Sequence, residues 1–273
     1  MNRFILHFVV AASCALTLTA CHNSMTYSPK ATQAELEQER IEHERVARAA
    51  GRTQPTSPMT LNRQSIMQRV NDVGARTQQA AYQQCIEMFG QQHKCAFNIE
   101  VANKGGLNAY ANGEKVVIFP EMVAFTHNDS ELGLILAHEM AHNIMMHPQG
   151  QQQNTAIGGI LGTLGDALAA SQGLNTGGAL SQLGAQRALL RYSSKFEREA
   201  DYVGLYILAR AGYDVAAAPE FWRRMSVANP DGIYTSTTHP TNPERYVNLK
   251  KTITEIQSKQ ANGQPLIPMM KKG

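Results

Sequence analysis

Apolar positions recur at intervals of three and four along several stretches of the chain, and this spacing predicts the helices of a packed domain. The stretches are residues 62–89, 130–147 and 193–212. Nearer the C-terminus, residues 216–260 predict a helix, a Pro-rich loop and a further helix. We therefore expect a packed domain that begins near residue 61.

Strand signals lie between the first two of these helices. The segments AFNIEVA (96–102) and LNAYANGEKVVIF (107–119) are short and bounded by polar residues and glycine, as is typical of strands. Gly113 and Glu114 fall in the middle of the second segment, where they indicate a turn. This segment therefore predicts a β-hairpin.

The chain begins with the pattern of an export signal. Residues 1–20 have a basic start at Arg3, an apolar stretch and small residues before Cys21. The sequence LTAC at 18–21 resembles the lipobox of bacterial lipoproteins, so Cys21 is the expected lipidation site and mature N-terminus. The next residue is His rather than Asp, which favours the outer membrane. The alternative is an ordinary cleaved signal in which Cys21 is incidental.

Residues 21–60 separate this anchor from the packed domain. Residues 31–50 are rich in Glu, Arg and Ala with only a thin apolar stripe, and residues 51–60 contain helix-breaking Gly and Pro. We expect a solvated helix and a linker, with a partner-binding helix as the alternative. The packed domain then covers 61–257, and residues 258–273 form a C-terminal tail.

Residues 150–190 form a biased segment within the domain, rich in Gly, Gln, Ala, Leu and Ser. Asp166 and the density of glycine make it a poor membrane helix. We expect a pair of loosely packed amphipathic helices or a mobile lid over the active site, with contact to a membrane as the alternative.

Composition and charge limit the classes of partner that the chain is expected to bind. The chain has 273 residues, of which 43% are hydrophobic, and a formal net charge of +3. Since this charge is small and no Gly-rich phosphate loop or aromatic-plus-basic stripe is present, a nucleic-acid partner is not expected. Of the four cysteines, Cys14 leaves with the signal and Cys21 carries lipid. Cys85 and Cys95 remain to form a disulfide in an oxidising compartment, or else two free buried thiols.

The segment HEMAH predicts a metal site. His138 and His142 are four residues apart, so a helix projects both from one face, where two imidazoles can chelate one ion. Glu139 lies next to the first histidine, where its carboxylate can take a proton from metal-bound water. A third ligand is still required. His147 lacks the preceding glycine turn of a known third-ligand pattern, and we interpret it as a histidine at the C-terminus of the helix.

The segment KFEREAD supplies the missing ligand. Glu197 and Asp201 are again four residues apart, so one helical face presents a carboxylate for the metal and another, one turn on, to orient a ligand histidine. A charged surface helix is the alternative interpretation of this segment taken alone. Together with HEMAH, it predicts a zinc site with three protein ligands.

HEMAH, EREAD and the later segment HPTNPER resemble the three signatures of peptidase family M48, and the resemblance covers residues 61–255. It is closest to the periplasmic lipoprotein members of the LoiP type. The resemblance implies an α+β, mainly α, gluzincin fold with a small β-sheet whose edge strand borders the active-site helix. It implies one Zn²⁺ per chain. The implied roles are zinc ligation by His138, His142 and Glu197, general-base catalysis by Glu139, support by Asp201, catalytic roles near the reacting carbonyl for His239 and Arg245, and substrate binding by Asn108, Ala109, Tyr110 and Ala111.

The resulting functional prediction is a zinc-dependent endopeptidase, lipid-anchored to the periplasmic face of the outer membrane. Its substrates would be unfolded or misassembled envelope proteins, with outer-membrane assembly machinery as a further partner. The alternative is a periplasmic chaperone or assembly factor whose zinc is structural, closed by His239 as fourth ligand, or self-inhibited by that residue.

Overall fold

The computed structural model describes residues 23–51, 61–234 and 241–271. These residues are mainly helical, with one small sheet, as the sequence predicts. The helices are α2 (Gln33–Ala50), α3 (Arg63–Phe89), α4 (Pro120–Phe125), α5 (Asp129–Ile144), α6 (His147–Ser171), α7 (Ala179–Arg210), α8 (Ala218–Ala228) and α9 (Asn242–Ala261), with short 3₁₀ turns at Val215–Ala217 and Pro230–Ile233. No helix within the described ranges has the length and apolar character needed to cross a membrane.

The sheet has three strands, β1 (Asn98–Val101), β2 (Ala109–Ala111) and β3 (Lys115–Ile118), in the order β1-β3-β2. Strand β3 pairs in parallel with β1 and antiparallel with β2, so the predicted hairpin is confirmed and β2 is an edge strand. Asn143 of α5 holds the hairpin turn, since its Oδ1 accepts from the Gly113 amide at 2.7 Å. The edge strand is therefore attached to the helix that carries HEMAH.

Helix α5 is the centre of the core. It packs against α3, α7 and the sheet, and nearly all of its residues are buried. It ends at Ile144, three residues earlier than predicted, because Met146 adopts a left-handed backbone with φ of 56° and redirects the chain into α6. The polar residues of α5 are therefore buried among apolar ones and need partners inside the protein.

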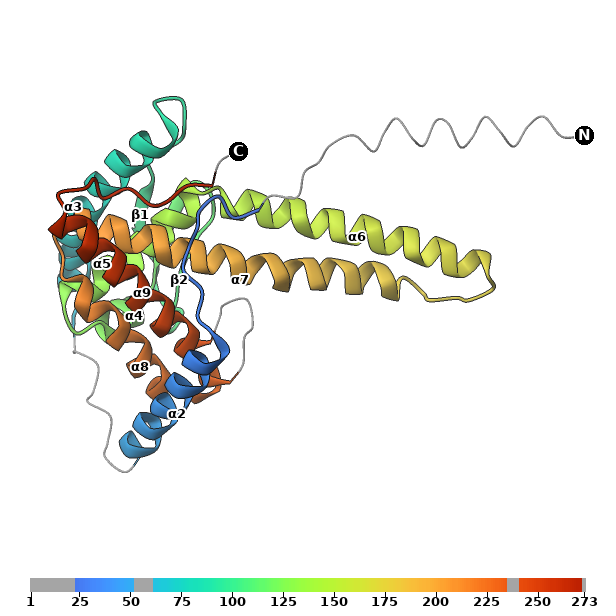
Figure 1. The fold of residues 1–273 in the computed structure, drawn as a ribbon, viewed down its shortest axis with the longest axis horizontal. Helices are drawn as coiled ribbons and strands as arrows, with labels where there is room; N and C mark the ends of the chain where they lie inside the picture. Colours follow the sequence, from blue (N-terminus) through green and yellow to red (C-terminus); the bar gives the residue numbers. More distant parts are fainter. Residues whose placement is uncertain (1–22, 52–60, 235–240, 272–273) are drawn as a thin grey trace, which may run out of the picture.

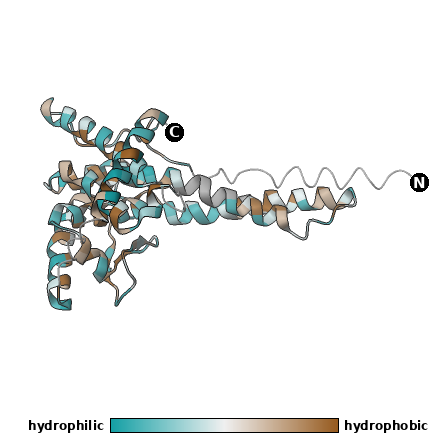
Figure 2. Ribbon diagram, turned by 90° about the horizontal axis from the view of Figure 1, so that it is seen from below, coloured by the Kyte–Doolittle hydropathy of each residue, from teal (hydrophilic) through white to brown (hydrophobic). Residues whose placement is uncertain are grey.

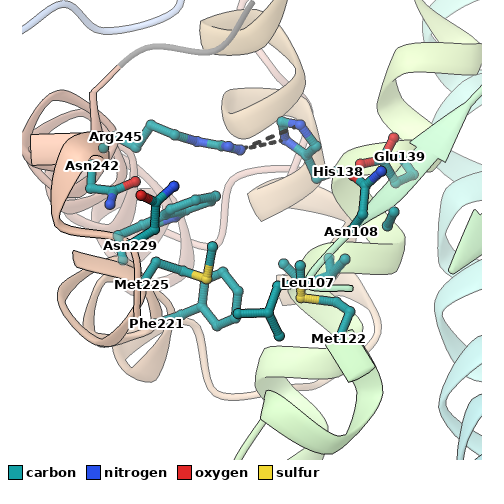
Figure 3. Close-up of a pocket in the computed structure, with 14 residues that line it drawn as sticks. Leu107, Asn108, Met122, His138, Glu139, Phe221, Met225, Asn229, Asn242 and Arg245 are labelled. Atoms are coloured by element: carbon teal, nitrogen blue, oxygen red, sulfur yellow. Dashed lines mark hydrogen bonds between the residues drawn. The ribbon is translucent and has the colours of Figure 1, made fainter. Parts of the chain in front are cut away.

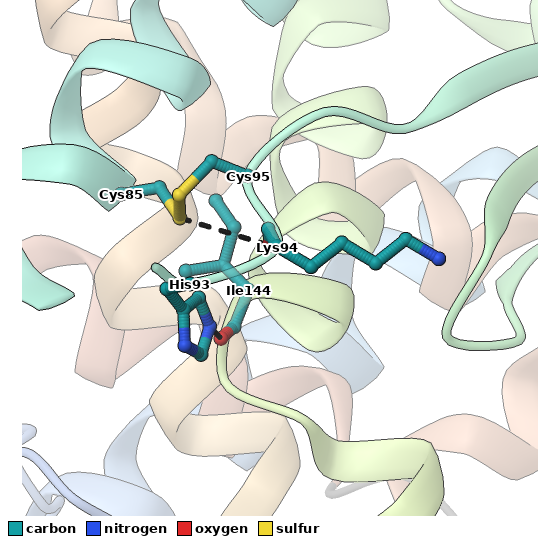
Figure 4. The surroundings of a disulfide bond; sticks show 5 residues. All are labelled: Cys85, His93, Lys94, Cys95 and Ile144. Atoms are coloured by element: carbon teal, nitrogen blue, oxygen red, sulfur yellow. Dashed lines mark hydrogen bonds between the residues drawn. A yellow bond between two sulfur atoms is a disulfide. The ribbon is translucent and has the colours of Figure 1, made fainter. Parts of the chain in front are cut away.

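The predicted disulfide joins Cys85, near the end of α3, to Cys95. The loop that it closes lies against the C-terminal end of α5, as Figure 4 shows. His93 in this loop donates from Nε2 to the Ile144 carbonyl at 2.7 Å, which satisfies one of the carbonyls that a helix end leaves without an intrahelical partner. The disulfide loop thus secures the helix that carries the two site histidines.

The N-terminal helix α2 differs from the prediction of a solvated helix, because it packs against α8 and α9. His43 is fully buried there, and its Nδ1 lies 2.7 Å from Ser226 Oγ. Glu39 pairs with Arg223 on the same face at 2.7 Å. The contacts between α2 and α8 are made by these polar side chains. The hydrophobic pattern of residues 31–50 therefore did not predict them.

The predicted tail is also ordered in part. Helix α9 runs to Ala261, and the segment beyond it turns back beside the N-terminal residues, where Thr26 and Met270 form an antiparallel bridge. Two backbone hydrogen bonds support this bridge, from the Tyr27 amide to Met269 O at 2.9 Å and from the Lys271 amide to Met25 O at 2.8 Å. The two described ends of the chain are therefore held together.

Residues 150–190 form two paired helices, which was one of the predicted alternatives. Helix α6 and the first part of α7 make a long hairpin that projects from the body of the protein (Figure 1). The boundaries differ from those predicted, since α6 begins at His147 and α7 continues without a break to Arg210. One helix therefore belongs both to the hairpin and to the core, and a lid role for the hairpin stays a prediction.

Candidate metal centre

His138, His142 and Glu197 come together where α5 crosses α7. The Nε2 atoms of the two histidines are 3.1 Å apart, and the Glu197 carboxylate oxygens lie 3.3 Å from His138 Nε2 and 3.2 Å from His142 Nε2. All three ligand atoms are within 4.8 Å of one another. Two imidazole nitrogens and one carboxylate oxygen are the donor set of a catalytic zinc site, which keeps a fourth position open. The residues present therefore fit zinc.

Gly204 allows the two helices to approach closely enough for this arrangement. It lies seven residues after Glu197 and three after Asp201, so all three occupy one face of α7. A methyl group at this position would lie 3.0 Å from the backbone Cα and N of His138 and 3.1 Å from the carbonyl carbon of Ala137. Backbone atoms of a buried helix cannot move aside easily, so glycine is required for the contact.

Asp201 fixes the orientation of His138. Its Oδ1 lies 2.9 Å from His138 Nδ1, and both side chains are buried. Since a carboxylate only accepts hydrogen bonds, Nδ1 carries the proton and Nε2 is free to face the other ligands. Burial and the Arg245 charge lower the pKa of His138, but Asp201 and Glu197 outweigh them and raise it to about 9.

Arg245 from α9 completes this cluster. Its guanidinium makes two hydrogen bonds to Asp201, from Nε to Oδ2 at 2.9 Å and from Nη2 to Oδ1 at 2.5 Å. The guanidinium also stacks on Trp222, 3.6 Å from the ring centroid. Burial raises the pKa of Asp201, whereas Arg245 and His138 lower it and prevail. The aspartate therefore stays ionised, and Arg245 is held at the edge of the site.

A second set of polar contacts supports the candidate ligands, and the sequence did not predict it. His147 is buried at the start of α6, where its Nδ1 lies 3.1 Å from His142 Nδ1 and its Nε2 lies 2.9 Å from Glu199 Oε2. The prediction that His147 lies at the C-terminus of the α5 helix was wrong, because α5 ends at Ile144. Only the fold brings His147 and Glu199 together, although the extra glutamate within EREAD was an available signal.

This second set of contacts extends to the N-terminal segment. Glu199 is fully buried, and its Oε1 accepts from the Thr26 amide at 2.5 Å. Burial raises the pKa of Glu199, and the bonds to Thr26 oppose that shift. The orientation of His142 is therefore connected through His147 and Glu199 to the N-terminal segment that contains Thr26.

A pocket opens beside the three ligands (Figure 3). His138 and Glu139 line it from α5, and Arg245 reaches it from α9 with its Nη2 3.1 Å from His138 Nδ1. Asn108 and Ala109 come from the edge strand β2 and its approach. The apolar part of the lining consists of Leu107, Met122, Ile135, Phe221, Trp222 and Met225. The predicted base and substrate-binding strand therefore face the same space as the histidine ligand.

Some predicted site residues lie elsewhere. Tyr110 and Ala111 belong to β2 but do not line the pocket, and the Tyr110 side chain is exposed. His239 and Cys21 lie outside the described residues, so their predicted roles in catalysis and lipidation stay predictions.

Comparison with known proteins gives one family match. The sequence model of peptidase family M48 matches residues 74–253, which include HEMAH, EREAD and Arg245. This span is most of the chain and contains both helices that form the candidate metal centre.

Curated relatives match over about half of this chain. The beta-barrel assembly-enhancing protease of Yersinia pestis is 33% identical over 141 residues, covering 48% of this chain and 28% of its own length. The mitochondrial metalloendopeptidase OMA1 of Schizosaccharomyces pombe is 30% identical over 151 residues, covering 54% of this chain and 43% of its own. The beta-barrel assembly-enhancing protease of Escherichia coli strain K12 is 29% identical over 139 residues, covering 48% and 28%. This chain thus spans less than half the length of these relatives.

Proposed function

The chain belongs to peptidase family M48, and from this premise we propose that it is a zinc-dependent endopeptidase of the bacterial cell envelope. The observation that carries the proposal is the convergence of His138, His142 and Glu197 beside a pocket that also contains Glu139. A purely structural zinc site would be enclosed by four protein ligands, whereas here one of the three candidate ligands, His138, lines an open pocket.

Zinc fits the triad as one ion per chain, held by His138, His142 and Glu197. When bound, it polarises a carbonyl and lowers the pKa of a bound water towards ~7. The protein contributes the orientation of the ligands. Asp201 holds the proton on His138 Nδ1, and His147 lies against Nδ1 of His142, so both ligands present Nε2 to the same point.

Glu139 is the proton-transfer group. Its side chain lines the pocket next to His138, so its carboxylate can take a proton from the attacking water and then give it to the leaving amine. Arg245 also lines the pocket, with its guanidinium beside His138, where its positive charge favours negative charge that develops on the carbonyl oxygen. Because Asp201 already holds its guanidinium at both Nε and Nη2, Arg245 acts from a fixed position. His239 is the proposed partner of Arg245 in this role.

Strand β2 is the proposed binding site for the substrate backbone. It pairs with β3 on one side only, and Asn108 and Ala109 at its start lie in the pocket. An extended chain can add to such an edge through main-chain hydrogen bonds, which requires little of the substrate sequence. A folded domain does not offer a free extended segment, so unfolded or misassembled chains are the proposed substrates.

We place the enzyme in the periplasm, attached to the outer membrane through lipid on Cys21. The Cys85–Cys95 disulfide supports an oxidising compartment, and the name of the Yersinia pestis relative associates that protein with β-barrel assembly. Envelope protein quality control is the proposed role, with outer-membrane assembly machinery as a proposed partner.

The test is cleavage of casein by purified protein, compared with Glu139→Gln. We expect wild type to cleave casein and the variant to lose cleavage while it binds as much zinc, since the change removes only the proton-transfer group. Glu114→Gln is the matched control, because Glu114 lies in the exposed β2–β3 turn and should keep full activity. Equal cleavage by wild type and Glu139→Gln would contradict the proposal.

A further inference from the structure

We propose that the outer end of the α6–α7 hairpin contacts lipid, with its exposed leucine face inserted at the boundary between head groups and acyl chains. The hairpin end is residues 157–186, and no step of the proposed peptidase chemistry uses it. The proposal begins from apolar side chains that a water-soluble hairpin would be expected to bury.

Helix α6 presents a continuous apolar stripe to solvent. The exposed fractions are 63% for Ile160, 60% for Leu161, 53% for Leu164 and 66% for Leu168. At about 100° per residue these four positions fall within one quadrant or so of the helix surface. Leu174, in the turn between the arms, is 62% exposed, and Figure 2 shows hydrophobic colouring along this outer part.

The two arms pack through small residues instead. A methyl group on Gly162 would lie 2.2 Å from the Leu180 carbonyl oxygen, so backbone approaches backbone there. Gly159 faces Ala185 in the same seam. Helix pairs in lipid are arranged in the same way, with small residues between the helices and leucines outside. Close backbone packing holds such helices together, and the apolar side chains face the acyl chains.

Charge is almost absent from the hairpin. Residues 148–186 contain one charged side chain, Asp166. Its carboxylate accepts from the amides of Leu180 at 3.1 Å and Ser181 at 2.9 Å, where the N-terminus of α7 favours negative charge. The single charge is therefore already compensated within the hairpin. A surface that faces water normally carries many charged residues of both signs.

The position of Asn23 favours lipid as the occupant, and this step rests on the proposed lipidation of Cys21. Asn23 Oδ1 accepts from Lys195 Nζ on α7 at 3.2 Å, at the base of the hairpin. Cys21, the proposed lipidation site, precedes Asn23 by two residues, which span at most about 7 Å. The outer arm of α7, from Lys195 to Ala179, is about 24 Å long. Anchor and hairpin can therefore meet one membrane surface if the hairpin lies along it, without crossing it.

The experiment uses full-length lipidated protein in vesicles of phosphatidylethanolamine and phosphatidylglycerol. A Leu168→Cys variant carries an environment-sensitive fluorophore, and Met67→Cys, exposed on α3, carries the same label as the control. We expect blue-shifted emission, quenched by brominated acyl chains, at position 168 and neither effect at 67. Equal signals at both positions, or none at 168, would overturn the proposal. A blue shift in detergent that grows with protein concentration would identify a second copy instead and overturn it as well.

A pair of variants separates lipid contact from folding. In the labelled protein, Ile160→Gln with Leu161→Gln should abolish most of the blue shift, whereas Ile41→Gln, an exposed residue of α2, should leave it unchanged. Zinc content should be unaffected in all of them, since none of these residues contacts the ligands. A blue shift retained in the double variant would contradict the proposal. Glu139→Gln should keep the shift, so failure of the peptidase proposal would be seen separately.

Discussion

The two ends of helix α7 place opposite kinds of side chain in opposite surroundings. Its inner end buries three carboxylates, on Glu197, Glu199 and Asp201, at exposed fractions of 4%, 0% and 3%. Its outer end exposes Leu180 and Leu183 by 37% and 41%. Burying charge and exposing leucine both cost free energy, which is why we propose a metal ion at the buried end and lipid at the exposed end.

The inner end shows how buried charges become tolerable. Asp201 contacts Arg245 and His138, Glu199 contacts His147, and Glu197 lies between the two ligand histidines. A buried ion pair is seldom more stable than an apolar replacement, yet loss of one partner leaves the other charge uncompensated. Such a cluster is best explained by the function that it serves, which we propose is to orient metal ligands.

The largest effect on zinc binding and activity is expected for Glu197→Gln, in the buried part of α7. A neutral amide is a poor zinc ligand, so we expect bound zinc to fall from about one per chain to near zero, with loss of casein cleavage. Elemental analysis of the purified protein measures the first effect. The control is Gln182→Ala at the outer end, an exposed position where both quantities should stay at wild-type values. Zinc retained in Glu197→Gln would exclude Glu197 as a ligand.

Asp201→Asn should have the next largest effect. It removes the carboxylate that binds the Arg245 guanidinium at two points and leaves only Glu197, at 3.8 Å, as a buried counter-charge, so we expect a loss of about 3–5 kcal/mol in the free energy of unfolding. Zinc affinity should weaken by about 10–100-fold, because His138 loses its orienting acceptor. Urea unfolding and a zinc competition titration measure the two effects. Asp166→Asn is the matched change in the hairpin and should leave zinc affinity unchanged; equal weakening in both variants would refute the role of Asp201.

Glycine-to-alanine changes should affect the free energy of unfolding differently at the metal centre and in the α6–α7 hairpin. Gly204→Ala places a methyl group against the α5 backbone, and we expect a destabilisation of about 1–3 kcal/mol. The methyl group of Gly165→Ala would meet only side-chain atoms of Leu180, at 3.3 and 3.8 Å, so the better helix propensity of alanine should leave stability unchanged or raise it by up to about 1 kcal/mol. Thermal unfolding of both variants checks the signs. Destabilisation at Gly165 equal to that at Gly204 would mean that the outer end is packed as tightly as the core.

The smallest effect is expected for Leu164→Gln with Leu168→Gln. These side chains are more than half exposed, so the free energy of unfolding in detergent should change by less than about 0.5 kcal/mol, and casein cleavage should be unchanged. A loss of several kcal/mol would show that the leucines pack against protein, and a change in casein cleavage would favour the predicted lid.

Local patterns sufficed for the features that depend on neighbouring residues. The spacing of four in HEMAH and EREAD places side chains on one helical face whatever the fold, and the structure brings His138, His142 and Glu197 together. The hairpin turn at Gly113 and the short loop between Cys85 and Cys95 are local for the same reason, and both are confirmed.

Features that depend on distant contacts were not predictable. The contact of His147 with Glu199 joins residues 52 apart, and that of His43 with Ser226 joins residues 183 apart. Neither pair carries a helical or strand periodicity, because each is a single polar contact between helices. The direction of the hairpin was also not predictable, since the same leucines would suit a lid packed on the pocket or a surface exposed to lipid.

The most direct test of the central claim, that α5 and α7 together hold a catalytic zinc, is X-ray absorption at the zinc edge on the purified protein. We predict nitrogen and oxygen ligands only, at about 2.0–2.2 Å, including two imidazoles and a water. In Glu197→Gln at the same protein concentration the zinc signal should be almost absent, because the variant is expected to bind almost no zinc. A sulfur ligand at about 2.3 Å, or a spectrum identical in wild type and Glu197→Gln, would contradict the account.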